Sequence, residues 1–281
     1  MTETTAAPDV AWAKAPLDRQ ALRTTLSNFH TLSYRNTVDG FLASAKNSGT
    51  HWVKFMLSNA MAAQWGKPAP ARTTGEAADD FIGPAKARRR YPELPNIGRT
   101  HTIPSALLTP APVRALFPLK PTVVLVRDIR QAMLSNYVKW RDDYGVSLAE
   151  YVRGAPGGKR FIADVWWYVL FFNRWGDMAR AGAPVLVARY EDVQADPAGQ
   201  IRRMADHWKL GLDDAAIAAG AAVSGREAMR ALQDPNFQEV IIPKAEVRNQ
   251  VAFSAEDEAF LDAVFVRYLR HDFGYGYPGR R

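Results

Sequence analysis

Three short segments of the chain combine polar side chains in a way that could bind an anion or move a proton. The first is 44–52, Ser-Ala-Lys-Asn-Ser-Gly-Thr-His-Trp, which joins an apolar run to a helical pattern. A turn of small residues between a strand and a helix offers backbone N–H groups at the positive end of the helix, where anions bind. Lys46, Ser48 and Thr50 add further donors. The turn lacks the G-x-x-x-x-G-K-[ST] pattern of a Walker A loop, and an ordinary tight turn is the alternative interpretation.

The second segment begins at Arg127, at the end of another apolar run, and includes Ser135 eight residues later. A guanidinium fork with a hydroxyl nearby is suited to a phosphate or sulfate group. An ion pair between Arg127 and the adjacent Asp128 is the alternative interpretation.

The third segment is Arg99-Thr100-His101. Of the five histidines, His101 is the one that directly follows a predicted strand. A neutral imidazole at that position could remove a proton from a hydroxyl group, whereas a purely structural histidine is the alternative.

The elements that would position these segments alternate along the chain. Short apolar runs predict strands at 39–44, 96–100, 122–126 and 185–188, and a 3.6-residue period predicts helices over 50–64 and 129–141. Asp196 followed by Pro197, and Ser254 with Asp257 three residues later, indicate two further helix starts. This alternation predicts an α/β fold of three layers, with a central parallel sheet flanked by helices and a P-loop-like turn. The three polar segments then lie at the same edge of the sheet.

Two stretches show weaker patterns. Residues 1–30 have no strong periodicity and are expected to form a loosely attached N-terminal segment of a single domain, 1–281. Residues 66–95 are rich in Pro, Gly, Ala and Arg, which is typical of a long surface loop.

The composition excludes several classes of protein. Of 281 residues, 47% are hydrophobic and 23% charged, so the chain is neither disordered nor collagen-like. A net charge of +7 favours an anionic partner. The lack of cysteine excludes disulfides and thiolate chemistry, and no spacing of His, Asp and Glu predicts a metal site. The N-terminus has no secretory pattern and no apolar run is long enough to span a membrane, which predicts a soluble, cytoplasmic protein.

Taken together, the motifs resemble those of the sulfotransferases that use 3′-phosphoadenosine 5′-phosphosulfate, the cytosolic type in particular. The resemblance runs from about residue 40 to 270 in the family's order. The segment 44–52 resembles the family's Y-P-K-S-G-T-T-W, and Arg99-Thr100-His101 its K-T-H. Arg127 to Ser135 resembles R-[DN]-P-[RK]-D-x-x-x-S, and Tyr190-Glu191-Asp192 resembles Y-E-D.

The resemblance implies transfer of a sulfuryl group to a hydroxyl, or to an amine, of a small acceptor, with adenosine 3′,5′-bisphosphate as the product. His101 would be the general base and Lys46 the catalytic cation. Arg127 and Ser135 would bind the 3′-phosphate, and Tyr190 would lie near the adenine. The loop that would hold the 5′-phosphosulfate consists of Lys46, Asn47, Ser48, Gly49, Thr50, His51 and Trp52, with Trp52 also near the adenine.

Two features depart from the family's pattern. Counting back from Ser48, the family's catalytic lysine aligns with Asn47, and Lys46 lies one position earlier; we expect Lys46 to fill the role. The family's late R-K-G segment is missing, and Lys244 and Arg248 are the basic residues in that region.

The acceptor pocket is expected among irregular segments and their aromatic neighbours, although aromatics at helical spacing more often pack in a core. An apolar or aromatic alcohol fits such a pocket better than a polysaccharide. The candidate wall residues are Tyr137, Trp140, Tyr144 and Phe237.

Two alternatives remain for the function: a P-loop nucleotide kinase or other phosphotransferase, and a catalytically impaired sulfotransferase-like binding protein, the latter suggested by Asn47. A nucleic-acid partner is not expected, because the basic run at 86–90 is interpreted as a solvated loop without a recognised binding module. No membrane partner is expected either, and the chain is expected to be a monomer or a homodimer.

Overall fold

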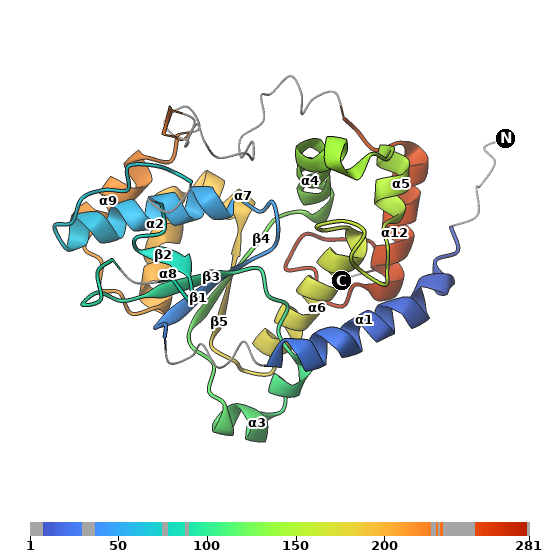
Figure 1. The fold of residues 1–281 in the computed structure, drawn as a ribbon, viewed down its shortest axis with the longest axis horizontal. Coiled ribbons are helices and arrows are strands. Elements are labelled where there is room, and N and C mark those ends of the chain that lie inside the picture. The colour runs from blue at the N-terminus through green and yellow to red at the C-terminus, as the bar shows by residue number, and fades with distance from the viewer. Residues whose placement is uncertain are drawn as a thin grey trace.

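Five parallel strands form the centre of the protein in the computed structural model, which describes residues 8–29, 37–74, 78–87, 90–225, 229, 231–232 and 251–279. Their order across the sheet is β2 (Ile82–Pro84), β3 (Ile97–Thr100), β1 (Gly40–Ser44), β4 (Thr122–Val126) and β5 (Val185–Arg189) (Figure 1). The predicted strands are confirmed to within one residue at their ends. β2 is an addition that the sequence did not predict.

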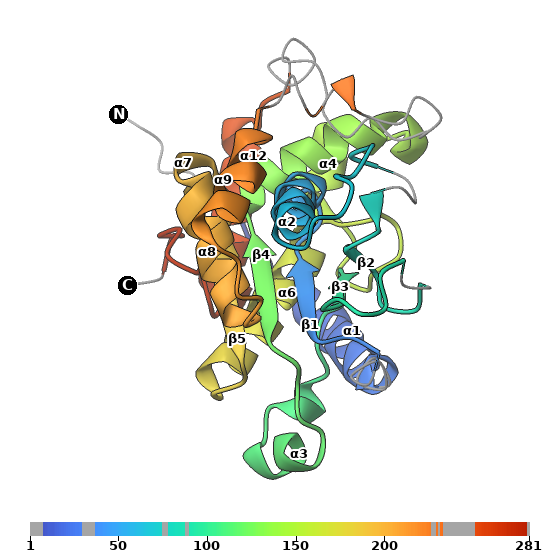
Figure 2. The ribbon, with the colours of Figure 1, turned by 90° about the vertical axis from the view of Figure 1, so that its left-hand side faces the viewer.

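Helices cover both faces of this sheet, as Figures 1 and 2 show. One face carries α2 (Thr50–Gln64), α8 (Pro197–His207) and α9 (Asp214–Ala222). The other carries α1 (Lys14–Ser27), α4 (Ile129–Tyr144), α5 (Leu148–Arg153), α6 (Val165–Arg180) and α12 (Ala255–Tyr268). The shorter elements are η1 (Ala11–Ala13), η4 (Ala106–Leu108), α3 (Ala111–Leu116) and α7 (Tyr190–Ala195).

The strands divide the core into two parts because successive side chains point to opposite faces of a sheet. Leu42 and Val123 pack on the α2 face, whereas Ala43 and Val124 pack on the α6 face, and all four are fully buried. The expected α/β fold with three layers is therefore confirmed.

Local signals in the sequence set several of the helix ends. α2 has the predicted bounds, while α4 continues past the predicted end to Tyr144 and stops at Gly145, which has a φ of 60°. Asp196 caps α8 by accepting a hydrogen bond from the Gly199 N–H, 2.9 Å away. Ser254 and Asp257 form the expected capping box of α12.

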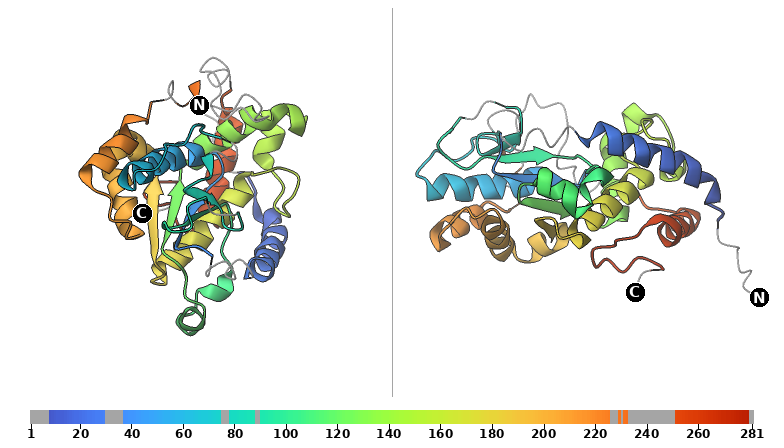
Figure 3. Two further views of the ribbon diagram at one scale, coloured as in Figure 1. Left: turned by 60° about the vertical axis from the view of Figure 1, so that its left-hand side comes forward. Right: turned by 90° about the horizontal axis from the view of Figure 1, so that it is seen from below.

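The N-terminal region differs from the prediction, because residues 14–27 form α1. This helix lies beside α6, away from α2 (Figure 3). Arg174 donates hydrogen bonds to the Thr25 hydroxyl (2.8 Å) and the Ala21 carbonyl (3.2 Å), and the Ser105 hydroxyl donates to the Thr25 carbonyl (2.6 Å). α1 has a weak amphipathic pattern and buries few side chains. Hydrogen bonds from Arg174 and Ser105 therefore contribute to holding this helix against the rest of the protein.

The region predicted as a long surface loop contains β2 and a half-buried carboxylate, that of Asp79. Asp79 Oδ1 lies 2.6 Å from Lys54 Nζ and 3.3 Å from Arg99 Nε. Lys54 is fully buried on α2; burial lowers the pKa of its ammonium group, and the neighbouring Asp79 opposes that shift. This ion pair therefore anchors the segment before β2 to the helix that follows β1.

Replacing Asp79 by alanine is expected to destabilise the protein by about 3–5 kcal/mol, since it leaves the Lys54 charge buried without its carboxylate. The matched control is Asp18→Ala, which removes the partner of Lys14 in an exposed pair on α1 and should change stability little. Urea unfolding of both variants measures the difference. Equal losses would contradict a structural role for the buried pair.

Candidate functional site

The carboxyl ends of β3, β1 and β4 bring the three polar segments together. Ala43 of β1 pairs with Thr100 of β3, and Ser44 pairs with Leu125 of β4. His101 and Arg127 follow these neighbouring strands directly. The edge formed by carboxyl strand ends is where open α/β sheets bind ligands.

The loop between β1 and α2 turns several of its carbonyl groups toward the body of the protein. The Lys46 carbonyl accepts from the Tyr168 hydroxyl (2.9 Å), and the Asn47 carbonyl accepts from Arg127 Nη1 (3.3 Å). Asn47 and Gly49 have left-handed φ values of 56° and 84°. The N–H groups of the first turn of α2 have no acceptor within the helix. The Ser48 hydroxyl is buried and has no hydrogen-bond partner within the described part of the chain. The loop therefore fits an anion.

His101 is held in one tautomer by the last residue of β1. Its Nδ1 lies 2.7 Å from the Ser44 carbonyl oxygen, which can only accept, so Nδ1 carries the proton and Nε2 keeps its lone pair. The Ser44 hydroxyl lies 3.2 Å from the same nitrogen and accepts from the Thr50 hydroxyl (2.8 Å). Ser44 thus joins the loop to the histidine.

The environment of His101 favours the neutral ring. His101 is in part exposed to solvent, but the protein packed around its ring lowers the pKa of His101. Lys46, Arg99 and Lys139 lower it further, while the hydrogen bond to Ser44 opposes the shift. A pKa below the ordinary histidine value leaves the ring uncharged near pH 7, so it is able to accept a proton.

His51, inside the loop, is also neutral. Burial, followed by the charges of Lys54 and Arg99, lowers the pKa of His51 to about 3. His51 therefore adds no positive charge to the anion site.

Two aromatic rings and a guanidinium group lie beside the loop. The rings of Trp52 and Tyr190 are 5.3 Å apart, and the Arg127 guanidinium lies 4.8 Å from the Tyr190 ring. Trp52 Nε1 donates to the Ser224 carbonyl (2.8 Å). Gly49 makes this arrangement possible, because a Cβ at that position would lie 2.6 Å from the Tyr190 ring.

Lys46 and Asn47 point to different neighbours. Lys46 Nζ donates to the Ile162 carbonyl (2.8 Å) and lies 5.6 Å from the Trp167 ring. The Asn47 side chain forms a hydrogen bond with Tyr168, whose pKa is raised by burial and lowered in part by that bond. The Lys46 side chain therefore lies at the start of α6, and the Asn47 side chain contacts Tyr168 on the same helix.

The other residues predicted for the site lie on α4 or outside the described part of the chain. Ser135 is half-buried on α4, one of the helices that begin at the ligand edge. Tyr137 donates to the Val146 carbonyl (2.9 Å) and Tyr144 donates to Asn136 Oδ1 (2.7 Å), and both rings pack against the buried Tyr151. This supports the core interpretation for these two tyrosines. Trp140 is half-buried on α4, and Phe237, Lys244 and Arg248 lie outside the described residues.

Two residues of this site were not predicted. Ser44 is the first residue of the predicted segment 44–52, but its part in orienting His101 depends on a carbonyl oxygen, which every residue has. Ile162 also takes part through its carbonyl, so no feature of its side chain could have signalled the contact with Lys46.

Gly49→Ala is expected to lose stability for two reasons, the left-handed φ and the contact with Tyr190. Gly145→Ala is the matched control, since Gly145 has a φ of 60° and open space around it. The control should lose about 1–2 kcal/mol, the cost of a left-handed alanine. Gly49→Ala should lose about 1–3 kcal/mol more, because the Tyr190 ring must move away from Trp52 and Arg127. Urea unfolding measures both losses, and an equal loss would show that the Tyr190 ring moves without a loss of stability.

The described residues contain neither a metal-ligand cluster nor a helix that could span a membrane. No group of three His, Cys, Asp or Glu side chains in the described part of the chain is placed to hold a metal ion. Among the helices that the structure describes, none has the length and apolar character needed to cross a membrane. The cytoplasmic location stays a prediction.

Comparisons with solved structures give likenesses at low identity. The mouse sulfotransferase SULT7A1, complexed with PAP, is 14% identical, with 91% of each chain covered and a TM-score of 0.49. The structure of retinol dehydratase with retinol and PAP is 15% identical, with 92% of this chain and 88% of that chain covered and a TM-score of 0.44. A sulfotransferase from Alicyclobacillus acidocaldarius is 15% identical, with coverages of 70% and 96% and a TM-score of 0.37.

Comparison of the sequence shows the family of the chain. No curated protein sequence matches the chain. A profile of the sulfotransferase domain family matches residues 38–254, a range that contains the loop, His101, Arg127 and Tyr190. Because this range spans well over half of the chain, the protein belongs to the sulfotransferase family and is an enzyme of that class.

Proposed function

We propose that this enzyme transfers the sulfuryl group of 3′-phosphoadenosine 5′-phosphosulfate to a hydroxyl, or to an amine, of a small acceptor, with His101 as general base. The observation that carries the proposal is the hydrogen bond from His101 Nδ1 to the Ser44 carbonyl. That bond orients a neutral imidazole next to a loop suited to an anion.

The nucleotide is assigned to the residues around this loop. The buried Ser48 hydroxyl and the first-turn N–H groups of α2 would hold the 5′-phosphosulfate, with Thr50 beside them. Arg127 and Ser135 would bind the 3′-phosphate, and Trp52 and Tyr190 would contact the adenine. Lys244 and Arg248 stay predicted contributors. When bound, the nucleotide supplies an activated sulfuryl group.

The protein's own part in the reaction is positioning, charge and proton transfer. His101 Nε2 takes the proton of the acceptor, and the imidazolium that forms is stabilised through Nδ1–H by the Ser44 carbonyl. Lys46 supplies positive charge from the edge of the loop, where charge stabilisation is most effective. No metal ion has a role in this scheme.

The acceptor is assigned to the side of the loop where Lys46 meets α6. Ile162 is exposed and Trp167 half-buried there, and the Ile162 N–H donates to the Tyr144 hydroxyl (3.2 Å). An apolar or aromatic alcohol fits such a surface. A single domain over 1–281, in a monomer or a homodimer, is part of the same proposal.

His101→Ala and Arg127→Ala are expected to have complementary effects. His101→Ala should lower kcat by about 10²–10⁴-fold, the usual contribution of a general base, and leave binding of adenosine 3′,5′-bisphosphate intact. Arg127→Ala should weaken that binding by about 10–100-fold through loss of a charged hydrogen bond. Transfer of labelled sulfate to a panel of phenols, alcohols and amines measures the first effect, and calorimetry the second.

Two outcomes, one of the transfer assay and one of a thermal-shift measurement, would overturn the proposal. Near-normal turnover by His101→Ala would remove the histidine from the mechanism. A larger thermal shift with ATP than with adenosine 3′,5′-bisphosphate would favour a nucleotide phosphotransferase.

Lys46→Ala and Asn47→Gly test which loop residue assists the transfer. Glycine is the matched replacement at position 47, because it keeps the left-handed φ of 56° without strain. We expect Lys46→Ala to lower kcat by about 10²–10³-fold, as removal of a charge-stabilising donor does, and Asn47→Gly to have a smaller effect. The reverse order would assign the role to Asn47. A wild-type protein that binds the nucleotide without transferring sulfate would be the impaired form.

A further inference from the structure

The C-terminal segment, defined here as residues 271–279, lies against the turn that carries Arg127. It continues from α12 and is drawn in red in Figure 1. Its two tyrosines, Tyr275 and Tyr277, form hydrogen bonds close to the start of α4.

Tyr277 binds the turn directly. Its hydroxyl accepts from the Ile129 N–H (2.6 Å) and donates to Asp128 Oδ2 (3.0 Å). The other carboxylate oxygen of Asp128 accepts from the Gln131 N–H (2.9 Å) and caps α4. One hydroxyl group therefore fixes both residues that follow Arg127.

Tyr275 acts on the same turn through Glu191. Its hydroxyl donates to Glu191 Oε2 (2.6 Å), and Glu191 Oε1 accepts from the Asp128 N–H (3.1 Å). Burial, together with the hydrogen bond to Glu191, raises the pKa of Tyr275, and burial raises that of Tyr277. Both hydroxyls therefore stay protonated and remain donors.

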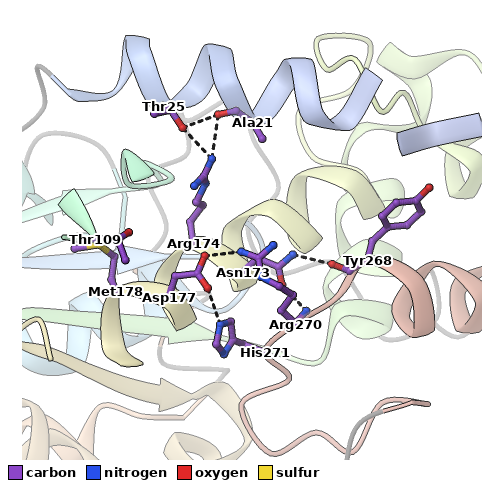
Figure 4. Close-up of polar contacts among 10 residues, drawn as sticks. All are labelled: Ala21, Thr25, Thr109, Asn173, Arg174, Asp177, Met178, Tyr268, Arg270 and His271. Atoms are coloured by element: carbon purple, nitrogen blue, oxygen red, sulfur yellow. Dashed lines mark hydrogen bonds and ion pairs between the residues drawn. The ribbon is translucent and has the colours of Figure 1, made fainter. Parts of the chain in front are cut away.

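The segment is anchored on both sides of these bonds. The Tyr277 ring is buried and lies 4.6 Å from the Phe265 ring of α12. His271 Nε2 lies 2.9 Å from Asp177 Oδ1 of α6, close to the Asn173 and Arg270 contacts (Figure 4). Gly176 leaves the space that the His271 ring occupies.

These bonds decide which groups near the turn are available to an anion. The N–H groups of Asp128, Ile129 and Gln131 are taken by protein oxygens. These three N–H groups are therefore unavailable to a phosphate, and recognition at this turn depends mainly on the Arg127 side chain. The nearby carboxylates of Asp128 and Glu191 are potential partners for that guanidinium, and each is occupied by a tyrosine hydroxyl instead. Arg127 forms no ion pair with any residue that the structure describes.

We propose that Tyr275 and Tyr277 are positioning residues for the 3′-phosphate site. They hold the carboxylates of Glu191 and Asp128 so that Arg127 faces the nucleotide rather than its acidic neighbours. This inference rests on the proposed function, which assigns the 3′-phosphate to Arg127.

The test compares two nucleotides that differ in the 3′-phosphate alone. Calorimetry with adenosine 3′,5′-bisphosphate and adenosine 5′-monophosphate is carried out on the full chain and on Tyr277→Phe, which keeps the ring. We expect Tyr277→Phe to lose affinity for the bisphosphate by about tenfold, the effect of one charged hydrogen bond, with the monophosphate unchanged. The matched control is Tyr268→Phe, because the Tyr268 hydroxyl donates to the Val10 carbonyl (2.7 Å) and not to the turn.

A double variant separates positioning from general stability. In Tyr277→Phe with Asp128→Asn, the released carboxylate is neutralised while the amide oxygen keeps the cap of α4, so the preference for the bisphosphate should return. Tyr275→Phe with Glu191→Gln provides the same pair of measurements should Tyr277→Phe unfold. An unchanged ratio of the two affinities, or an equal loss for both nucleotides, would overturn the inference. A wild-type protein that binds both nucleotides equally would instead overturn the assignment of the 3′-phosphate to Arg127, and the inference with it.

Discussion

The last residue of the central strand is the junction on which the candidate site depends. Ser44 accepts from His101 through its carbonyl and from Thr50 through its hydroxyl, so one buried residue links the imidazole to the start of α2. The bond to His101 depends on the parallel pairing of β1 with β3, which brings the carboxyl ends of the two strands together. The sheet therefore fixes the distance between the base and the anion loop more firmly than either loop could alone.

Charge around this junction has two separate uses. Lys54 and Arg99 share the Asp79 carboxylate, so part of the positive charge is structural and anchors the segment before β2 to α2 and β3. Lys46 contacts the Ile162 carbonyl and the Trp167 ring, and Arg127 contacts the Asn47 carbonyl and the Tyr190 ring. Lys46 and Arg99 also help to keep His101 neutral by lowering its pKa. Positive charge near the loop therefore favours both a bound anion and an uncharged His101 beside it.

The parts of the structure that the sequence predicted are those with local signals. β1, β4 and α2 have continuous apolar runs or a clear helical period, and the caps at Asp196 and Ser254 depend on neighbouring residues. β2 is short and ends in Pro84, which suits an edge strand but breaks the strand pattern. α1 was missed because much of what holds it comes from Arg174 and Ser105, far along the chain. Contacts made by backbone carbonyl oxygens, such as those of Ser44 and Ile162, cannot be predicted from residue type.

The surroundings of Arg127 show why the position of a charged residue in the sequence is not enough to define its function. The motif places the guanidinium next to Asp128, and the fold adds Glu191, so an ion pair is the nearest stable arrangement for this side chain. The structure avoids it by giving each carboxylate other donors: backbone N–H groups at the start of α4 and the hydroxyls of the C-terminal tyrosines. A carboxylate whose oxygens already accept hydrogen bonds competes less strongly for a cation. The availability of Arg127 is therefore a property of the whole fold, and it depends on residues at the opposite end of the chain from the loop.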